Sequence, residues 1–365
     1  MKKILLVHHC DSWGGAGISL ISLIKMLKGT YEVSVVVPNE GSAVWQKVKK
    51  EKVEVIAMQE QIGMISAYNG GPKTFSRTFL RNYFQTFKNK GKLESIIERI
   101  RPDIVAVNSM TLSWIGKLVG GVAERVCFIR ETQVNNLGMK IIKYELKKHF
   151  DKIIYISEFD RRHFALPNKS CVVRDSVEKD RYKNELTKPY LQKALGLDVN
   201  KKYVIFVGGD DPIKGLKQLQ QAFQYIGTNN IECVVAGNVA ESNKTEDKRF
   251  HYIGKQLDMA KVYGAADVLV FCPVFAHQGR PVFEAGFLKL PVIVPDFEEL
   301  SECVEDKING LIFARNNSKS LAKRIIEILE DDYLYDNCAE NNYVRSLKEH
   351  EESSCRNDLL QFLAE

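Results

Sequence analysis

The sequence predicts an α/β fold with two successive domains, each built from parallel strands that alternate with helices. Short apolar runs rich in valine and isoleucine recur through both halves of the chain, with room between them for the crossover helices that a parallel sheet requires. A polar stretch at residues 178–189 separates the two series of strands. We therefore expect one Rossmann-like domain at residues 1–180 and a second from residue 181 onward.

Composition agrees with a globular protein of this class. The 365 residues are 45% hydrophobic, and no segment reaches the roughly 18 consecutive apolar residues of a membrane-spanning helix. Lys2 and Lys3 precede an apolar run, but the run ends at Val7 and therefore predicts a first strand, not a signal peptide. Eight cysteines and seven histidines show no metal-ligand spacing. These features predict a cytoplasmic protein with reduced cysteines and no metal site.

Charge is distributed unevenly between the two predicted domains. Residues 1–180 hold 29 lysines and arginines against 18 aspartates and glutamates, a net charge of +11. Residues 181–365 hold 23 against 28, a net charge of −5. A basic first half suggests an anionic partner, which is a membrane surface, a phosphorylated acceptor or a nucleic acid.

Six apolar runs predict the strands of the first domain, at residues 3–9, 31–38, 53–58, 102–109, 125–132 and 152–157. A helix is expected at residues 114–121, after the fourth strand. A glycine-rich turn from Trp13 to Gly17 follows the first strand and opens a helix that ends at Gly29. Glycines there let the backbone approach a ligand and leave helix N–H groups available to an anion. A plain tight turn explains these glycines equally well.

Residues 73–92 interleave basic and aromatic side chains on a predicted helix. This mixture suits the interface of an anionic membrane. An ordinary amphipathic helix of the first domain is the competing interpretation. No recognised nucleic-acid-binding module accompanies the basic run, so the sequence disfavours a nucleic acid as the partner.

The second domain opens with a strand from residue 203 that ends at Gly208 and Gly209, and a helix begins at Lys214. A lysine at a helix N-terminus has the wrong charge for the helix dipole, unless an anion such as a diphosphate lies between them. A solvated surface lysine is the alternative. Further strands are expected at residues 231–238, 251–254, 268–272, 291–295 and 308–314.

The stretch from residue 267 to residue 302 reads as strand, loop, helix and strand. Pro281 suits the first helical position, and Glu284 lies in the second turn among apolar neighbours. A lone buried carboxylate is costly, and a helix start after a parallel strand faces the ligand crevice. Ribose or hexose hydroxyl groups are therefore candidate partners for Glu284, while an interaction with the helix dipole is the other interpretation.

The segment GRPVFEAGFLKLPVIVPD resembles the donor-binding signature of the retaining GT-B glycosyltransferases of family 4, whose usual form is EGFGxxxxEAMAxGxPVVA. The residues in register are Gly279, Glu284, Ala285, Pro291 and Val292. Ala276 takes the place of the first glutamate of that family, which puts the usual contact to the transferred sugar in doubt.

A second motif of the family, GRLxxxKG, is matched by Lys214, whereas its arginine is replaced by Gly209. The resemblance implies that Lys214, Arg280 and Glu284 form the catalytic set, with Arg280 as a substitute for the missing arginine. The donor-binding residues that it implies are Gly15, Ala16, Gly208, Gly209, Lys214, Gly254, Lys255, Leu257, His277, Gln278, Gly279, Arg280, Pro281, Val282 and Glu284.

On the acceptor side, the resemblance points to Trp13, Arg130 and Glu131, although a salt-bridged strand end explains the last two equally well. It also implies a GT-B fold, with two Rossmann-like domains facing each other across a cleft. The first domain, residues 1–180, would bind the acceptor, and residues 181–345 would bind the nucleotide-sugar. A helix at residues 346–365 would cross back to the first domain.

The implied activity is transfer of a sugar from a nucleotide-sugar to an acceptor hydroxyl with retention, a hexosyltransferase-type reaction of class EC 2.4 without cofactor or metal. The implied setting is bacterial surface polysaccharide or glycolipid assembly, with a saccharide or lipid-linked saccharide acceptor at the inner face of the membrane. Ala276 and Gly209 favour a different reading, a non-catalytic GT-B partner or donor-binding subunit. A nucleotide-sugar epimerase is less favoured because no carboxylate pair is arranged for proton transfer.

Overall fold

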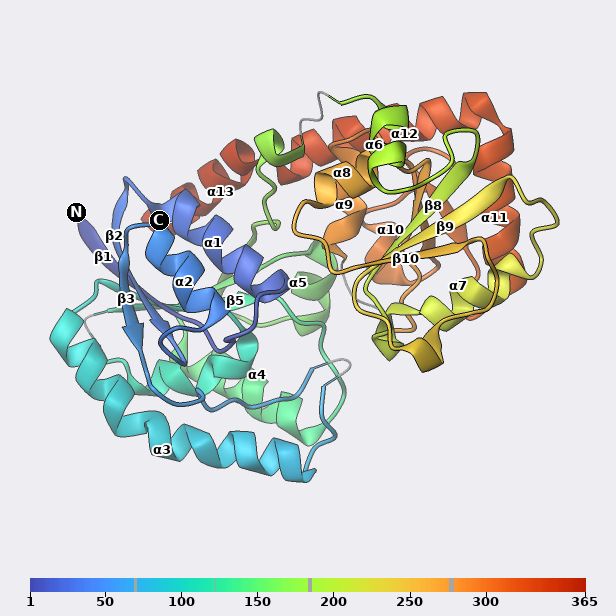
Figure 1. Cartoon of the computed structure of the whole chain (residues 1–365). Helices are drawn as coiled ribbons and strands as arrows, with labels where there is room; N and C mark the ends of the chain where they lie inside the picture. The colour runs from blue at the N-terminus through green and yellow to red at the C-terminus, as the bar shows by residue number, and fades with distance from the viewer. Residues whose placement is uncertain (69–70, 122, 183–185, 276–278) are drawn as a thin grey trace. The chain divides into compact units, whose positions relative to one another are not determined.

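The computed structural model describes residues 1–68, 71–121, 123–182, 186–275 and 279–365 (Figure 1). The chain forms two compact units. The first unit is Met1–Ser176 together with Glu352–Glu365, and the second unit is Val177–Glu351. The units thus meet four residues before the expected end of the first domain at residue 180, and the terminal segment joins the first unit at residue 352 instead of residue 346.

A parallel sheet of seven strands forms the centre of the first unit, in the order β3-β2-β1-β4-β5-β6-β7. The strands are β1 Lys2–Val7, β2 Tyr31–Val37, β3 Glu54–Ala57, β4 Ile104–Val107, β5 Glu124–Ile129, β6 Lys152–Tyr155 and β7 Lys169–Val172. The six expected strands are present, and β7 is an addition. The strand order reverses between β1 and β4, which is where ligands bind in open α/β sheets.

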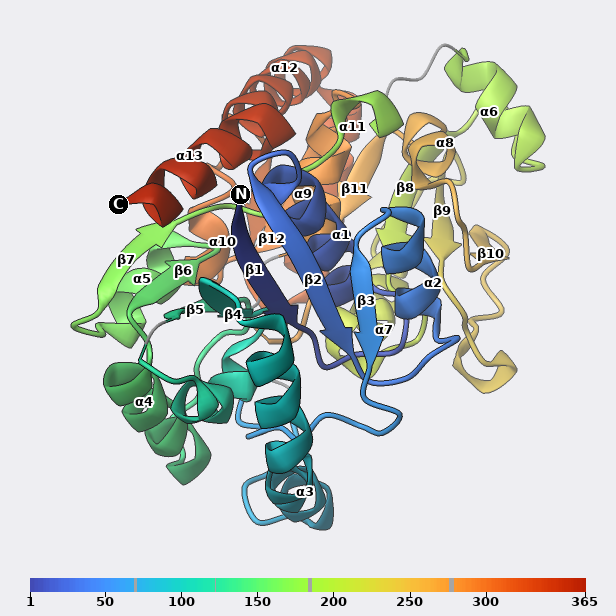
Figure 2. The same ribbon diagram turned by 90° about the vertical axis from the view of Figure 1, so that its left-hand side faces the viewer.

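Helices cover both faces of this sheet (Figure 2). On one face lie α1 Gly15–Leu27, α2 Ala43–Lys50 and α13 Glu352–Ala364. On the other face lie α3 Arg77–Ile100, η1 Met110–Leu118 and α4 Leu137–His149, while α5 Glu158–Phe164 precedes β7. The prediction of a helix at residues 114–121 is wrong in both type and position, because η1 is a 3-10 helix that starts at Met110. The Ser109 hydroxyl accepts a hydrogen bond from the Thr111 amide at 3.1 Å and starts this tighter turn earlier.

The terminal helix α13 packs against α1 and one face of the first sheet. Leu359 and Phe362 are buried in that contact. The buried Lys152 ammonium lies 2.8 Å from a Glu124 carboxylate oxygen and donates to the Leu363 carbonyl oxygen at 3.2 Å. A cation at the carboxyl end of a helix is favourable, so Lys152 helps to hold α13 on the first unit.

The second unit contains a parallel sheet of six strands in the order β10-β9-β8-β11-β12-β13. These strands are β8 Lys202–Val207, β9 Ile231–Ala236, β10 Phe250–Gly254, β11 Val268–Val270, β12 Val292–Pro295 and β13 Leu311–Phe313. All six were expected from the sequence. The order reverses between β8 and β11, whose register pairs Ile205 with Leu269.

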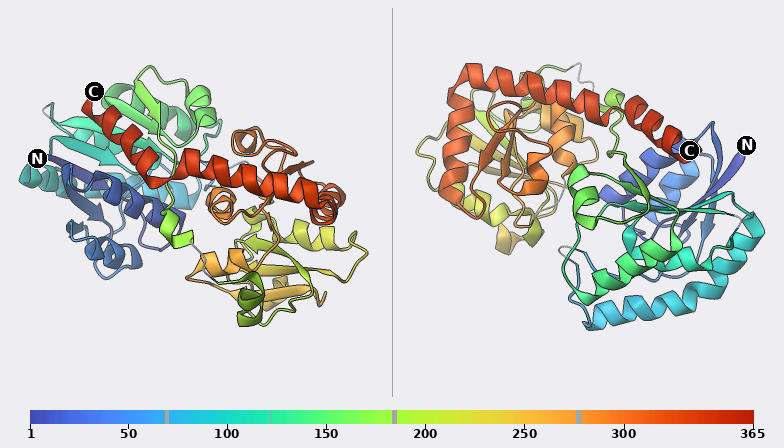
Figure 3. Two further views of the ribbon diagram at one scale, coloured as in Figure 1. Left: turned by 90° about the horizontal axis from the view of Figure 1, so that it is seen from above. Right: turned by 180° about the vertical axis from the view of Figure 1, so that it is seen from behind.

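Helices also cover both faces of the second sheet (Figure 3). On one face lie α8 Met259–Gly264, α9 Arg280–Gly286 and α10 Glu298–Ser301, and on the other lie α7 Leu216–Phe223 and α11 Ser318–Glu330. The remaining elements are η2 Lys179–Tyr182, α6 Lys188–Ala194, η3 Pro212–Lys214, η4 Glu241–Asn243 and α12 Asp332–His350. In the part of the chain that the structure describes, no helix is both long and apolar enough to cross a membrane.

The two ends of the second unit are joined to each other. The Val177 amide donates to the His350 carbonyl oxygen at 2.7 Å, and Val177 forms a parallel bridge with Glu351. The His350 ring stacks on Phe283 of α9, with ring centroids 3.8 Å apart. The segments where the chain enters and leaves the second unit are therefore hydrogen-bonded to each other. This contact explains why the unit boundaries fall at Ser176 and Glu351.

Candidate functional site

The loop after β8 lies at the point where the strand order of the second sheet reverses. Gly208 has a φ of +152°, and a Cβ there would lie 2.7 Å from Cγ of Lys214. The missing side chain of Gly208 therefore leaves the space through which the Lys214 stem passes. Burial lowers the pKa of Lys214 below that of an ordinary lysine, and nearby Asp211 opposes this effect. Lys214 ends the 3-10 turn η3, and α7 begins two residues later than expected, at Leu216. The role of Lys214 at a donor phosphate stays a prediction.

A second contact fixes this loop against the segment that follows β11. Gly215 has a φ of +87°, and a Cβ there would lie only 1.9 Å from the Cys272 carbonyl oxygen. The Cys272 thiol lies 3.4 Å from the Gly215 carbonyl oxygen, and the Val274 amide donates to the Ile213 carbonyl oxygen at 2.9 Å. The loop that carries Lys214 is thus fastened to the segment leading to α9.

Gly209 occupies the position at which the related motif has an arginine. Its φ is +61°, and a Cβ there would lie 2.3 Å from the Asn238 carbonyl oxygen. The backbone of this chain therefore has no room for an arginine at that position. Gly209 belongs to a close crossing of strand ends, because a Cβ on the neighbouring Gly237 would lie 2.4 Å from the Gly209 nitrogen.

A cavity of about 260 Å³ lies against the same loop, lined in part by Asp210, Asp211, Lys217 and Asn243. Asp210 accepts hydrogen bonds from the Ala240 amide at 2.8 Å and from the Asn243 side chain at 2.9 Å. Two carboxylates in the wall repel a diphosphate, so this cavity does not suit the phosphates of a donor.

Glu284 is buried in α9, as expected, but it is not the lone carboxylate that the sequence suggested. One carboxylate oxygen lies 3.2 Å from Arg280 Nε, one helical turn earlier, and the other accepts from the Tyr263 hydroxyl at 3.2 Å. The Glu284 carboxylate, after the larger effect of burial, raises the pKa of Tyr182 and also that of Tyr263. Both phenols therefore remain protonated beside Glu284. The prediction that Glu284 needs a ligand because it is unpaired is therefore wrong. A ligand hydroxyl would bind Glu284 in addition to Arg280 and Tyr263.

Arg280 is the first residue of α9 and is largely buried. Besides its pairing with Glu284, its guanidinium lies 5.6 Å from the Phe283 ring centroid. Gly279, just before it, is required because a Cβ there would lie 2.3 Å from the Phe271 ring. Arg280 thus has a carboxylate partner within its own helix, which limits its use as a second cation for a diphosphate.

The other predicted donor residues of the second unit lie at the same edge of its sheet. The Gly254 carbonyl oxygen at the end of β10 accepts from the Gly237 amide at the end of β9 at 2.8 Å. Lys255 and Leu257 follow, and Leu257 is 85% exposed. Pro281 and Val282 lie in α9. The predictions at Ala276, His277 and Gln278 fall outside the described residues.

The remaining predicted residues belong to the first unit. Gly15 and Ala16 begin α1, and Trp13 lies just before them. Arg130 and Glu131 directly follow β5. Their roles in binding a donor or acceptor stay predictions.

A hydrogen-bonded chain of polar residues crosses the switch point of the first sheet. The Asn108 side-chain amide lies 3.1 Å from His8 Nδ1, and Arg130 Nε donates to Asn108 Oδ1 at 2.8 Å. Arg130 also pairs with Asp175, which accepts from the Ser19 hydroxyl at 2.9 Å. The interpretation of Arg130 as a salt-bridged strand end is thereby confirmed for its ion pair.

His8 is fully buried in this chain of contacts. Burial lowers the pKa of His8 well below its usual value, and His9 and Arg130 lower it further. Asn108 accepts from Arg130 through its oxygen, so its NH2 group donates to His8 Nδ1 and the imidazole proton resides on Nε2. The sequence analysis assigned no site role to Asn108 or Asp175, although Asn108 is the first polar residue after a buried strand.

Glu131 turns toward the start of η1. It accepts a hydrogen bond from the Ser109 hydroxyl and one from the Met110 amide at 3.3 Å. Burial raises the pKa of Glu131, and these hydrogen bonds oppose the rise. The first unit thus presents neutral imidazole, amide and paired charged groups where its sheet order reverses.

Two parallel-sheet Rossmann-like units, with glycine-rich turns at the strand ends of the second sheet, define the GT-B class of fold. Comparisons with known proteins agree with this fold class. Residues 188–345 match the family described as Glycosyl transferases group 1. Among solved structures, HepE of Anabaena in complex with UDP and glucose aligns with a TM-score of 0.81 and 16% identity over 100% of both chains.

Relatives identified by sequence are distant. The chain is 25% identical over 353 residues to the N,N'-diacetylbacillosaminyl-diphospho-undecaprenol alpha-1,3-N-acetylgalactosaminyltransferase of Campylobacter jejuni, covering 87% of this chain and 88% of that protein. It is 25% identical over 167 residues to an uncharacterized glycosyltransferase of Methanocaldococcus jannaschii, covering 42% of this chain and 43% of that protein. These findings support the GT-B glycosyltransferase superfamily and a glycosyltransferase role.

Proposed function

We propose that the protein transfers a hexose-type sugar from a nucleotide-sugar to an acceptor hydroxyl, with retention of the anomeric configuration. The observation that carries this proposal is the placement of Lys214. It lies at the switch point of the second sheet, with its stem packed over Gly208 and its loop fastened to Cys272. A fixed cation at that edge suits the diphosphate of a donor.

The mechanism assigned to Lys214 is electrostatic. As the bond between the sugar and the nucleotide breaks, negative charge grows on the leaving diphosphate, and a preorganised ammonium stabilises that charge in the transition state. The partly buried position of Lys214 strengthens this interaction, because water screens it less than at an exposed site. The mechanism needs no metal ion, so we expect turnover to persist in the presence of a chelator.

Glu284 is proposed to hold the ribose of the nucleotide. A carboxylate has about four acceptor positions, so the contacts with Arg280, Tyr263 and Tyr182 still leave capacity for a ribose hydroxyl. In this proposal Arg280 orients Glu284, and its role toward the phosphates is secondary. Gly15 and Ala16 are assigned to the donor phosphates at the start of α1.

The acceptor is assigned to the first unit, where Trp13, Arg130 and Glu131 lie near the carboxyl ends of β1 and β5. The Campylobacter relative is named for an acceptor on diphospho-undecaprenol, and a Staphylococcus aureus relative is named for capsular polysaccharide biosynthesis. By analogy we propose a lipid-linked saccharide acceptor, surface polysaccharide or glycolipid assembly, and a location at the cytoplasmic face of the membrane.

A second candidate is a donor-binding partner subunit without activity. Gly209 favours it, because the backbone there has no room for the cation that related proteins place at this position. Binding and turnover together distinguish the two candidates.

Thermal unfolding with a panel of nucleoside diphosphates and nucleotide-sugars tests the proposed function. A ligand well above its Kd stabilises the folded state by a few kcal/mol. We expect one nucleotide to raise the Tm, and its sugar conjugate to be hydrolysed or transferred. Binding without turnover would support the partner subunit, and the absence of any shift would refute the donor site.

A further inference from the structure

The exposed side of α3 and the residues just before it carry large apolar rings that no other described part of the chain covers. Phe75, Phe84 and Phe87 are 64%, 61% and 62% exposed. Three phenylalanines with this exposure in one segment are unusual for a surface that faces only water. Nothing in the proposed transfer reaction uses them.

Two of these rings, Phe75 and Phe87, are held in place by a row of aromatic contacts that begins just before α3 and continues along it. Phe75, Phe79, Tyr83 and Phe87 follow one another at helical spacing, with neighbouring centroids 6.3, 6.3 and 5.5 Å apart. Phe79 in this row is buried in the core of the first unit. The exposed rings of Phe75 and Phe87, at the two ends of the row, are therefore connected to the core through Phe79 and Tyr83.

The segment that carries these rings is strongly basic. From Lys73 to Leu93 the chain contains no aspartate or glutamate, whereas exposed basic residues include Arg77, Arg81, Lys88 and Lys90. Lys90 lies 3.9 Å from the Glu94 carboxylate one turn further along, so basic side chains exceed acidic ones on this side of the helix without excluding them. Such a combination of exposed rings and excess positive charge complements a surface that is anionic at its headgroups and apolar just below them.

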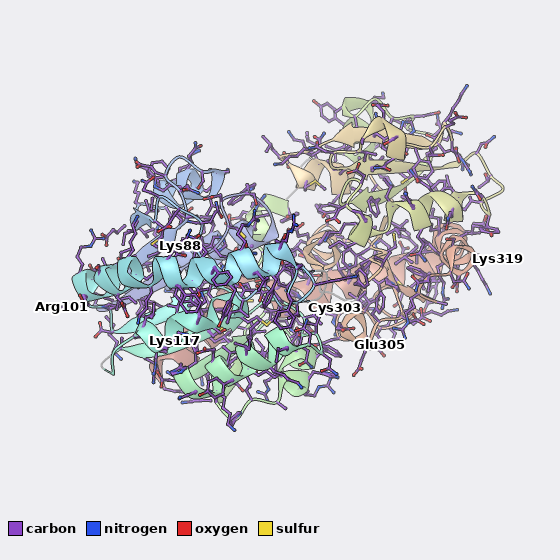
Figure 4. All side chains as sticks on the ribbon, turned by 90° about the horizontal axis from the view of Figure 1, so that it is seen from below. Lys88, Arg101, Lys117, Cys303, Glu305 and Lys319 are labelled. Atoms are coloured by element: carbon purple, nitrogen blue, oxygen red, sulfur yellow. The ribbon has the colours of Figure 1, made fainter. Side chains whose placement is uncertain are left out.

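The neighbouring helix α4 extends the same surface. Gly138 at its start is so close to α3 that a Cβ there would lie 3.1 Å from the Phe79 ring. Figure 4 shows α3 and α4 on the same side of the first unit, with Lys88 labelled on α3. On α4, Tyr144 is 57% exposed beside the exposed Lys147 and Lys148, whereas its acidic residue Glu145 is buried.

We propose that the exposed side of α3 and α4, from Lys73 to Lys92 and from Leu137 to Lys148, docks on an anionic lipid bilayer. The rings enter the headgroup region while the basic side chains contact lipid phosphates. Its use for reaching a lipid-linked acceptor rests on the proposed function, but the lipid contact itself rests on these residues alone.

The test is co-sedimentation of the full chain with vesicles of phosphatidylcholine and phosphatidylglycerol, compared with vesicles of phosphatidylcholine alone. No nucleotide is added, so failure here is separate from failure of the transferase proposal. We expect binding to the anionic vesicles that weakens as salt is raised. The double variant K88Q/K90Q should reduce partitioning about fivefold for each lysine removed.

The matched control is K319Q/K323Q, which removes two exposed lysines from α11 of the second unit. It should bind vesicles like the unchanged protein. F84A/F87A should reduce binding even at low salt, and its far-UV circular dichroism should be unchanged because both rings are exposed.

Failure of the unchanged protein to sediment with anionic vesicles would overturn the proposal and leave this surface to a protein partner. Equal losses in K88Q/K90Q and K319Q/K323Q would also overturn it, because the attraction would then come from overall charge.

Discussion

The Glu284 carboxylate and the Arg280 guanidinium form a largely buried ion pair within one turn of α9. Removing one partner of such a pair leaves a buried charge without its counterion, at a cost of roughly 3–5 kcal/mol. Part of this pairing is readable from the sequence, because an arginine four residues before a glutamate faces it on a helix. The contact with Tyr263 is not, because it joins residues that are distant along the chain.

Replacement of Glu284 by Gln is therefore expected to destabilise the second unit as well as weaken donor binding. We predict a decrease of about 3 kcal/mol in the free energy of unfolding, measured by urea denaturation without ligand. Glu298→Gln, at an exposed position of α10, is the control and should change little. A Glu284→Gln protein as stable as this control would contradict the buried pairing described here.

The two histidines after β1 predict a dependence of stability on pH. Burial holds the pKa of His9 at about 4 and that of His8 well below its usual value. As the pH falls below about 6.5, the unfolded chain takes up protons that the folded chain does not, so folding stability decreases on acidification. Each histidine contributes about 1.4 kcal/mol per pH unit in the steep part of this range.

Denaturation of the unchanged protein and of His9→Phe, at pH values from neutral to mildly acidic, measures this contribution. His9→Phe should show a smaller loss of stability over the same range. Identical pH profiles would show that His9 titrates normally in the folded protein.

Among the secondary-structure elements, the parallel strands were predictable because each is a short apolar run between polar segments. The helix α4 was missed, although Met139, Ile142 and Leu146 are buried at helical spacing and are visible in the sequence. The form of η1 was not predictable. Gly116 lies where a Cβ would meet the Phe150 ring at 2.5 Å, a contact made only in the folded chain.

The terminal helix α13 contributes to the stability of the first unit. Phe362 is buried against the first unit, and its ring lies 5.6 Å from the Lys152 ammonium. Phe362→Ala should lower the free energy of unfolding of the first unit by about 3–5 kcal/mol, because it opens a cavity in the core. Unfolding followed by hydrogen exchange resolves the two units separately. A loss of protection confined to the second unit would contradict the assignment of α13.

For the molecule as a whole, the sequence supports two α/β units, and the structure locates the candidate donor residues of the second unit at one edge of its sheet. Gly209 shows what a motif alone leaves out. Its missing side chain looks like a lost cation in the sequence, whereas in the fold it is required by the Asn238 carbonyl. Lys214 is the remaining cation of this motif. We therefore expect it to contribute more to stabilising the diphosphate charge than the same lysine does in relatives that also have the arginine.

Donor turnover by Lys214→Ala, compared with that by Lys217→Ala, tests whether the Lys214 ammonium stabilises charge on the leaving diphosphate. Lys217 is exposed at the start of α7, three residues further along, so its replacement changes the net charge equally. We predict that Lys214→Ala lowers kcat by about 10²–10³-fold, as for loss of a group that stabilises transition-state charge, whereas Lys217→Ala retains full turnover. Equal kcat values in the two variants would contradict this role of Lys214.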